Sequence, residues 1–172
     1  GDPTCSVVLG GLAATHSLRL KQIYKNGGGD SFDVVNIHPF MDPRLSNPMQ
    51  SLKGIYLGLY KEMQKNGGER KPIWFTEIGS PGVSKNRWNE RTRGWFLGTS
   101  GDEEEQARWV EKVYGEPLRW KGVQKIFWAF FRDTPGHFQS GVDYFGLVRP
   151  DFSKKPAFES YKKLTNFSRP SR

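Results

Sequence analysis

The stretch that decides the fold is "KPIWFTEIGSPG" (71–82), in which a proline and a short apolar run lead to one carboxylate and a Gly-Ser-Pro-Gly turn. The apolar run indicates a buried strand that ends at Glu77. Placing an acid at the end of an apolar strand costs free energy unless the acid is paired or used. Glu77 is therefore the first candidate for a functional residue.

Strands and helices alternate along the rest of the chain. Short runs rich in β-branched or aromatic residues predict four strands, at 6–13, 32–40, 71–77 and 123–131. Apolar spacing and helix end signals predict four helices, at 18–26, 51–68, 100–120 and 154–164. Ser100 and Glu103 fit a capping box at the start of the third helix. The alternation predicts an α/β fold with a parallel sheet, which a barrel and an open doubly wound sheet both satisfy.

Composition narrows the class of protein. The 172 residues are enough for one domain with a core, and the single cysteine, Cys5, excludes an internal disulfide framework. No apolar run is long enough to span a membrane. The basic residues behind the net charge of +8 are scattered, so the charge indicates either a solvated surface or affinity for an anionic polymer such as an acidic polysaccharide. Neither nucleic acid nor a membrane is an expected partner.

The residues at the strand ends are the ones that could carry chemistry. The strands end in Gly11 and Ala13, in His38, in Glu77 and in Trp128. In parallel sheets, ligands collect at the carboxyl ends of the strands. A carboxylate beside a histidine and a tryptophan suits sugar chemistry, because glycosidases need a carboxylate at the anomeric centre and aromatic faces bind sugar rings.

Several other chemistries lack their motifs. The glycines at 27–29 precede a strand and do not open a helix, so they do not form a phosphate loop. The sequence has no HExxH, no pair of cysteines and no GxSxG, so neither a protein-held metal nor a serine nucleophile is expected. We expect no cofactor.

Three segments resemble the last half of the clan A glycoside hydrolases, which are (β/α)8 barrels. They are "FDVVNIHPF" (32–40), "KPIWFTEIG" (71–79) and "FWAFFRD…GVDYFGLVRPDFSKKPAFESY" (127–161), and they look closest to family 39 and related xylosidase- or cellulase-like branches. The resemblance implies that residues 1–172 form a single half-barrel domain, strands five to eight of a TIM barrel, with a flexible basic tail at 168–172.

The resemblance also implies roles for individual residues. Glu77 matches the nucleophile of a retaining β-glycosidase, and Trp128 matches the residue that floors the reacting sugar's subsite. His38 matches a site histidine, whereas Phe40 stands where the family has a tyrosine. Other candidates for contact with an oligo- or polysaccharide substrate follow the last strand or lie in the long loop before the third helix: Arg132, Asp133, His137, Trp88 and Trp95.

The resemblance to the clan A enzymes does not include one of their two catalytic carboxyl groups, the general acid/base. In the clan, the general acid/base follows an asparagine at the end of strand four, which precedes the first strand of this chain. We interpret Asn89-Glu90, in the loop after Glu77, as coincidental. The chain alone is therefore expected to be inactive, and to pair with the missing N-terminal half of the barrel or with a second copy that covers its sheet edges.

Two other functions remain open from the sequence. One is a non-catalytic half-barrel that binds carbohydrate, and the other is a flavodoxin-like α/β module that binds a small molecule. The targeting region would lie outside this chain, and the glycosidase interpretation favours an extracellular or periplasmic location over a cytoplasmic one.

Overall fold

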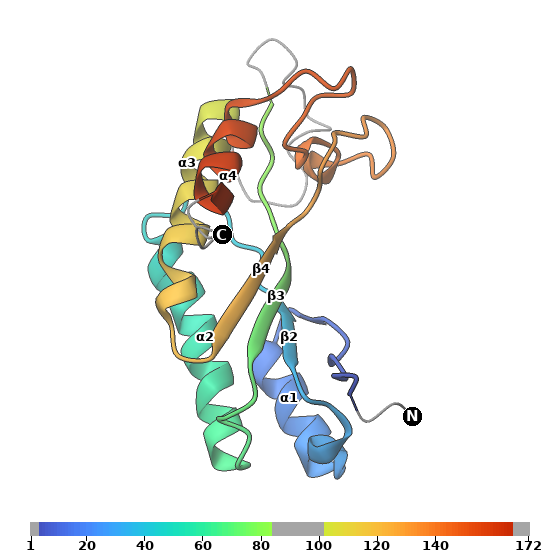
Figure 1. The fold of residues 1–172 in the computed structure, drawn as a ribbon, viewed down its shortest axis with the longest axis vertical. Helices are drawn as coiled ribbons and strands as arrows, with labels where there is room; N and C mark the ends of the chain where they lie inside the picture. The colour runs from blue at the N-terminus through green and yellow to red at the C-terminus, as the bar shows by residue number, and fades with distance from the viewer. Residues whose placement is uncertain (1–3, 84–101, 167–172) are drawn as a thin grey trace. The chain divides into compact units, whose positions relative to one another are not determined.

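The computed structural model describes residues 4–83 and 102–166 (Figure 1). The chain divides into two units, which are described separately. Unit 1 comprises Gly1–Pro39, Gln50–Ile78 and Pro117–Phe127, and unit 2 comprises Phe40–Met49, Gly79–Glu116 and Trp128–Arg172. The single half-barrel domain stays a prediction, and the tail at 168–172 lies outside the described residues.

The sheet is four-stranded, and its strands follow one another in chain order, β1-β2-β3-β4. The strands are β1 (Leu12–Ala13), β2 (Val35–His38), β3 (Ile73–Ile78) and β4 (Val123–Trp128), whose last residue belongs to unit 2. Ile37 of β2 lies opposite Leu12 of β1 and Phe75 of β3 in parallel register. The amide of Ile73 donates to the carbonyl of Gly122 at 2.7 Å, beside the start of β4.

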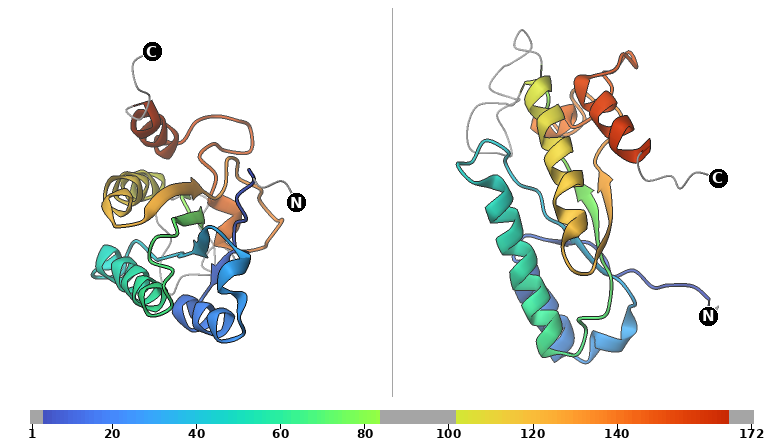
Figure 2. Two further views of the ribbon diagram at one scale, coloured as in Figure 1. Left: turned by 60° about the horizontal axis from the view of Figure 1, so that its bottom comes forward. Right: turned by 60° about the vertical axis from the view of Figure 1, so that its left-hand side comes forward.

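The helices of unit 1 lie on one side of this sheet (Figure 2). They are α1 (His16–Lys25) and α2 (Pro48–Lys65), with the short 3-10 helix η1 (Gly28–Ser31) between α1 and β2. A doubly wound sheet has helices on both faces and reverses its strand order at a switch point. Chain-order strands with helices on one side are instead what part of a barrel requires. The fold is thus α/β, with parallel strands alternating with helices, as predicted, and it is consistent with part of a TIM barrel.

The two faces of the sheet differ in polarity because side chains alternate along each strand. One face is apolar and fully buried, formed by Val35, Ile37, Ile73 and Phe75. The buried residues of the helices, among them Leu20, Leu59 and Met63, complete this core. Asn36 and His38 of β2 and Thr76 of β3 alternate with these residues and so belong to the opposite face.

Unit 2 is built on two helices, α3 (Glu103–Gly115) and α4 (Pro156–Asn166), which lie side by side (Figure 1). Their contact is an apolar cluster formed by Ala107, Val110, Leu147 and Ala157, with Tyr114, Trp128, Phe158, Tyr161 and Leu164 packed against it. Two further 3-10 helices occur, η4 (Pro117–Arg119) in unit 1 and η5 (Gly141–Tyr144) in unit 2. No helix within residues 4–83 and 102–166 is long and apolar enough to cross a membrane.

Several element boundaries differ from those predicted. The first strand was expected over 6–13, but β1 has two residues, and Val8 makes only an isolated bridge to Val34. The last strand ends at Trp128 rather than at 131.

The cap of α3 was also wrongly predicted. Ser100 lies outside the described residues, and the helix begins at Glu103 with Asp102 as its N-cap. The Asp102 carboxylate accepts the Glu105 amide at 2.8 Å, and as an anion it also interacts favourably with the positive end of the helix dipole.

Candidate active site

The carboxyl ends of β2 and β3 bring His38 and Glu77 together. His38 Nδ1 lies 3.4 Å from Glu77 Oε2, and the two side chains are 20% and 43% exposed. Both residues belong to unit 1, so their contact depends only on the register of neighbouring strands. Among residues 4–83 and 102–166, the ionisable partner of Glu77 is therefore the imidazole of His38, and the Glu77 carboxylate is partly exposed.

Two residues that the sequence did not single out form hydrogen bonds on the side of His38 that faces away from Glu77. His38 Nε2 lies 3.0 Å from Thr76 Oγ1, and Thr76 Oγ1 lies 2.7 Å from Asn36 Oδ1. The Thr76 amide also donates to Asn36 Oδ1, at 3.3 Å, and Asn36 is buried. For Asn36 the available signal was the period of two, since it lies two residues before His38 and so shares its face of the strand. Thr76 could be noticed only as a polar residue in an otherwise apolar strand.

The backbone of the first segment completes the surroundings of His38. A Cβ added to Gly11 would overlap the imidazole, lying 2.6 Å from its Cδ2 and closer still to Nε2. From α1, His16 donates its Nε2 proton to the His38 carbonyl at 3.3 Å. Burial lowers the pKa of His16, and the nearby His38 and Arg19 act in the same direction, although the bond to the His38 carbonyl opposes them. His38 thus lies between the backbone of Gly11 and the buried His16, and burial favours the neutral form of His16.

The other predicted site residues belong to unit 2. The indole of Trp128 donates to the Phe145 carbonyl at 2.8 Å, and the ring of Phe40 lies 5.9 Å from that of Phe145. The guanidinium of Arg132 lies 4.8 Å from the ring centre of Phe152. Contact of Trp128, Phe40 and Arg132 with substrate stays a prediction.

Asp133 is buried and bound within unit 2. Its Oδ1 accepts Lys155 Nζ at 2.8 Å and the Gly146 amide at 2.9 Å. Burial raises the pKa of Asp133 to about 6, with the Lys155 ammonium and the Gly146 amide opposing that rise. Lys155 is fully buried, which lowers its pKa, and it also donates to the carbonyls of Gly82 and Tyr144 at 2.9 and 3.0 Å. Asp133 is therefore bound within the interior of unit 2, and contact with substrate stays a prediction for it as well.

The remaining sequence candidates are placed only in part. His137 packs edge-on against Phe138, with ring centres 4.5 Å apart. Trp88, Trp95 and Asn89-Glu90 lie outside the described residues. Within residues 4–83 and 102–166, no three His, Cys, Asp or Glu side chains gather as a metal site requires.

Comparisons with known proteins bear on the fold. No family model matches the sequence, and no curated protein matches it. Solved structures do match. A GH2 β-galacturonidase from Eisenbergiella tayi bound to galacturonate is 18% identical with a TM-score of 0.61, over 81% of this chain and 24% of that one. A monomeric β-xylosidase from Caulobacter crescentus CB15 is 21% identical with a TM-score of 0.61, over 95% of this chain and 34% of that one.

A third similar structure is a GH113 β-1,4-mannanase, 16% identical with a TM-score of 0.57, over 95% of this chain and 46% of that one. The chain thus spans less than half the length of each of these structures. At such identities the likeness concerns the fold. The chain resembles part of glycoside hydrolase catalytic domains, and these structural neighbours are glycosidases.

Proposed function

We propose that the chain carries the nucleophile of a retaining glycoside hydrolase that acts on β-glycosidic bonds of an oligo- or polysaccharide. The observation that carries the proposal is Glu77, a half-exposed carboxylate at the carboxyl end of a parallel strand, held by the imidazole of His38. Barrel enzymes keep their catalytic residues at this edge. The similar structures support the bond type, since each is named for the cleavage of a β-linked sugar. Because these structures come from more than one glycoside hydrolase family, they do not single out one family for this chain. Membership of clan A and the likeness to family 39 are therefore parts of the proposal.

In this mechanism Glu77 attacks the anomeric carbon and forms a covalent glycosyl ester, while a second carboxyl group protonates the leaving oxygen. That second group then removes a proton from water, which attacks the same carbon and releases the sugar with its configuration retained. The two carboxyl groups must lie about 5–5.5 Å apart.

The second carboxyl group is not found beside Glu77 in unit 1. In the described part of that unit, the other carboxylates are Asp30, Asp33, Glu62 and Glu69. Asp30 and Asp33 precede β2, and Glu62 and Glu69 lie between the last turn of α2 and the start of β3. All four therefore stand at the amino end of the sheet, a strand length of roughly 13–20 Å from Glu77. Unit 1 thus offers no acid/base among its described residues, and the resemblance to clan A barrels supports one from a segment that precedes this chain, so we infer that the chain alone does not cleave glycosides.

The edges of the sheet are consistent with a partner segment, which would supply the acid/base. Within unit 1, β1 and β4 are the edge strands, and an exposed apolar side chain lies near each: Val7, a few residues before β1, is 54% exposed and Phe127 on β4 is 46% exposed. Unpaired edges favour pairing with another chain segment. We propose the N-terminal half of the barrel as that segment, with a second copy of the chain as the alternative that a measured molecular mass would reveal.

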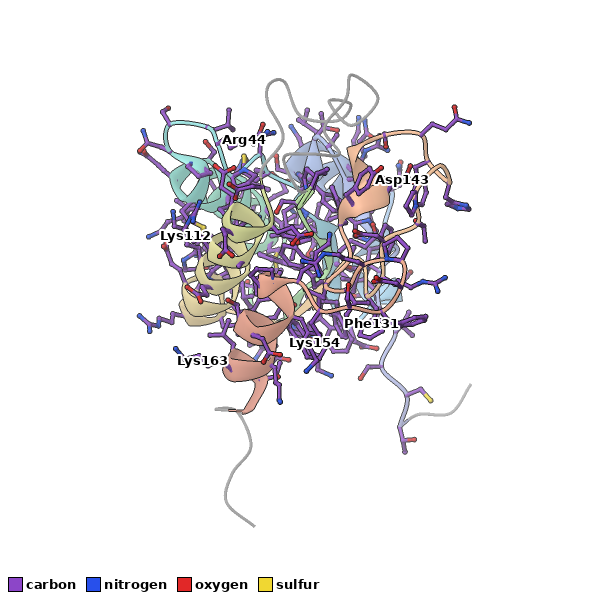
Figure 3. The ribbon with its side chains drawn as sticks, turned by 90° about the horizontal axis from the view of Figure 1, so that it is seen from above. Arg44, Lys112, Phe131, Asp143, Lys154 and Lys163 are labelled. Carbon is purple, nitrogen blue, oxygen red and sulfur yellow. The ribbon has the colours of Figure 1, made fainter. Side chains whose placement is uncertain are left out.

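Exposed aromatic rings support a second candidate, a half-barrel that binds carbohydrate without cleaving it. In unit 2 the rings of Phe130 and Phe138 stack nearly parallel, with centres 5.8 Å apart. Phe131 (labelled in Figure 3) and Phe152 are about 60% exposed. Flat exposed rings of this kind can bind sugar faces.

One assay separates the two candidates. The purified chain is tested on aryl β-glycosides alone and after reconstitution with the segment that precedes it in the full-length protein. We expect activity only in the reconstituted enzyme, with formation of a covalent intermediate on Glu77 that a 2-fluoro glycoside traps and peptide mass spectrometry locates. Sugar binding without turnover in the reconstituted protein would favour the second candidate, and turnover by the chain alone would contradict the inferred position of the acid/base.

A further inference from the structure

A chain of hydrogen bonds runs from the interior of unit 1 to His38, which contacts Glu77. It begins at the buried side chain of Asn36, passes through the hydroxyl of Thr76 and reaches His38, whose other ring nitrogen faces Glu77. Each link constrains the proton of the next, because some of these atoms can only donate and others can only accept.

The first link fixes the orientation of the Asn36 amide. The Thr76 backbone N–H can only donate, and it points at the Asn36 side chain at 3.3 Å, so the atom it meets is Oδ1 and not the NH2 group. Oδ1 is an acceptor. The Thr76 hydroxyl, 2.7 Å from the same Oδ1, must therefore give its single proton to Asn36.

The second link fixes one proton on His38. Because the Thr76 hydroxyl has no further proton to give, it meets His38 Nε2 as an acceptor at 3.0 Å. His38 must then carry a proton on Nε2. Gly11 keeps the ring in this place, since the imidazole lies so close to the glycine that a Cβ there would overlap it.

The third link involves Glu77. A neutral imidazole with its proton on Nε2 would present a lone pair on Nδ1 to the carboxylate oxygen 3.4 Å away, and two acceptors facing each other repel. The contact is favourable only when a proton lies between them, either on Nδ1 as part of an imidazolium or on Glu77 as a neutral acid. Burial lowers the pKa of the neighbouring His16 and so disfavours a competing positive charge there.

We propose that Asn36 and Thr76 are positioning residues that keep the neutral form of His38 protonated on Nε2, so that Nδ1 is the ring nitrogen that faces Glu77 and a proton on Nδ1 makes His38 an imidazolium. The assignment of catalytic meaning to this pair rests on the proposed function. The Nδ1 atom faces Oε2, which leaves Oε1 as the oxygen of Glu77 that attacks the anomeric carbon. The hydrogen-bond chain thus orients the histidine that the nucleophile contacts.

Nitrogen-15 NMR of the histidine side chains tests this without any substrate. Two-bond proton–nitrogen spectra distinguish the two imidazole tautomers, and a His38→Gln variant assigns the His38 signals. In the unaltered protein and in Thr76→Ser, which keeps the hydroxyl, we expect neutral His38 to carry its proton on Nε2. In Thr76→Val we expect the ratio of tautomers to shift about tenfold towards Nδ1–H, because the Glu77 carboxylate then becomes the better acceptor.

Two outcomes would overturn the proposal: an Nδ1–H tautomer of neutral His38 in the unaltered protein, or no shift in folded Thr76→Val. If Thr76→Val does not fold, the tautomers of the unaltered protein and of Thr76→Ser still decide. Failure of the proposed function looks different, since it would leave the Nε2–H tautomer and its dependence on Thr76 intact while the reconstituted protein lacked glycosidase activity.

Discussion

The imidazole of His38 packs directly against the backbone of Gly11, leaving no room for a side chain at that position. The neighbouring Gly10 offers a matched control, since a Cβ there would meet nothing within 4 Å, and neither glycine has the positive backbone φ that would strain an alanine. Gly11→Ala should push the ring out of its contact with Thr76 and Glu77, whereas Gly10→Ala should leave it in place.

We predict that Gly11→Ala lowers kcat/KM of the reconstituted enzyme on the order of 100-fold, because a displacement of about 1 Å in a catalytic group can cost that much. Gly10→Ala should remain within about twofold of the unaltered enzyme. Steady-state kinetics on an aryl β-glycoside gives both values, and circular dichroism checks that the variants fold. Equal activity of the two variants would show that the position of His38 does not matter for catalysis.

Replacing Glu77 should abolish turnover while leaving the fold intact. Glu77→Gln keeps the size of the side chain but removes the charge that attacks the anomeric carbon, so kcat of the reconstituted enzyme should fall on the order of 10⁴-fold. Glu69→Gln changes a carboxylate of the same unit at the other end of β3 and should keep near-normal activity. Retained activity in Glu77→Gln would remove this residue from the mechanism.

Although several strand boundaries were wrong, the sequence placed His38 and Glu77 at the carboxyl ends of two parallel strands and so predicted that they meet at one edge of the sheet. It did not predict the roles of Asn36 and Thr76. Their contact depends on the register between strands 40 residues apart in the chain, which no local pattern specifies. For the same reason, the sequence identified Gly11 only as the end of a strand. Its close packing against the His38 imidazole is seen only in the structure.

Asp133 shows a different reason why sequence reasoning stopped short. Its place after the fourth strand made it a candidate for contact with substrate, yet its carboxylate binds Lys155, 22 residues further along the chain. A carboxylate after a barrel strand and a lysine before a helix each have ordinary roles on a surface. Only the folded loops bury both together, in the interior of unit 2.

The buried lysine predicts a large stability difference between two adjacent residues. Lys155 donates to Asp133 and to two carbonyls, so Lys155→Met should lower the free energy of unfolding by about 3–5 kcal/mol, since it leaves a buried carboxylate without its cation. Lys154 is exposed and pairs with Glu159 at 3.2 Å, so Lys154→Met should cost about 0–1 kcal/mol. Urea unfolding at pH 7 measures both, and equal losses would contradict the structural role of Lys155.

The pKa of Asp133 predicts how this stability depends on pH. Burial raises that pKa from 3.8 to about 6, so between these values the native state holds a proton that the unfolded chain has released. The sign follows from linkage: the native state binds more protons, so the contribution of Asp133 to the free energy of unfolding is greatest below pH 3.8 and is lost as the pH rises through 6.

Asp133→Asn removes this titration and provides the reference. Relative to Asp133→Asn, the unaltered protein should lose on the order of 2–3 kcal/mol of stability between pH 4 and pH 6.5, as measured by urea unfolding at several pH values in one buffer series. Asp151→Asn is the control, because Asp151 is fully exposed and its pKa is instead lowered, chiefly by hydrogen bonds from Ser153. A gain in relative stability over this pH range would show that attraction to Lys155 outweighs the cost of burying the Asp133 charge.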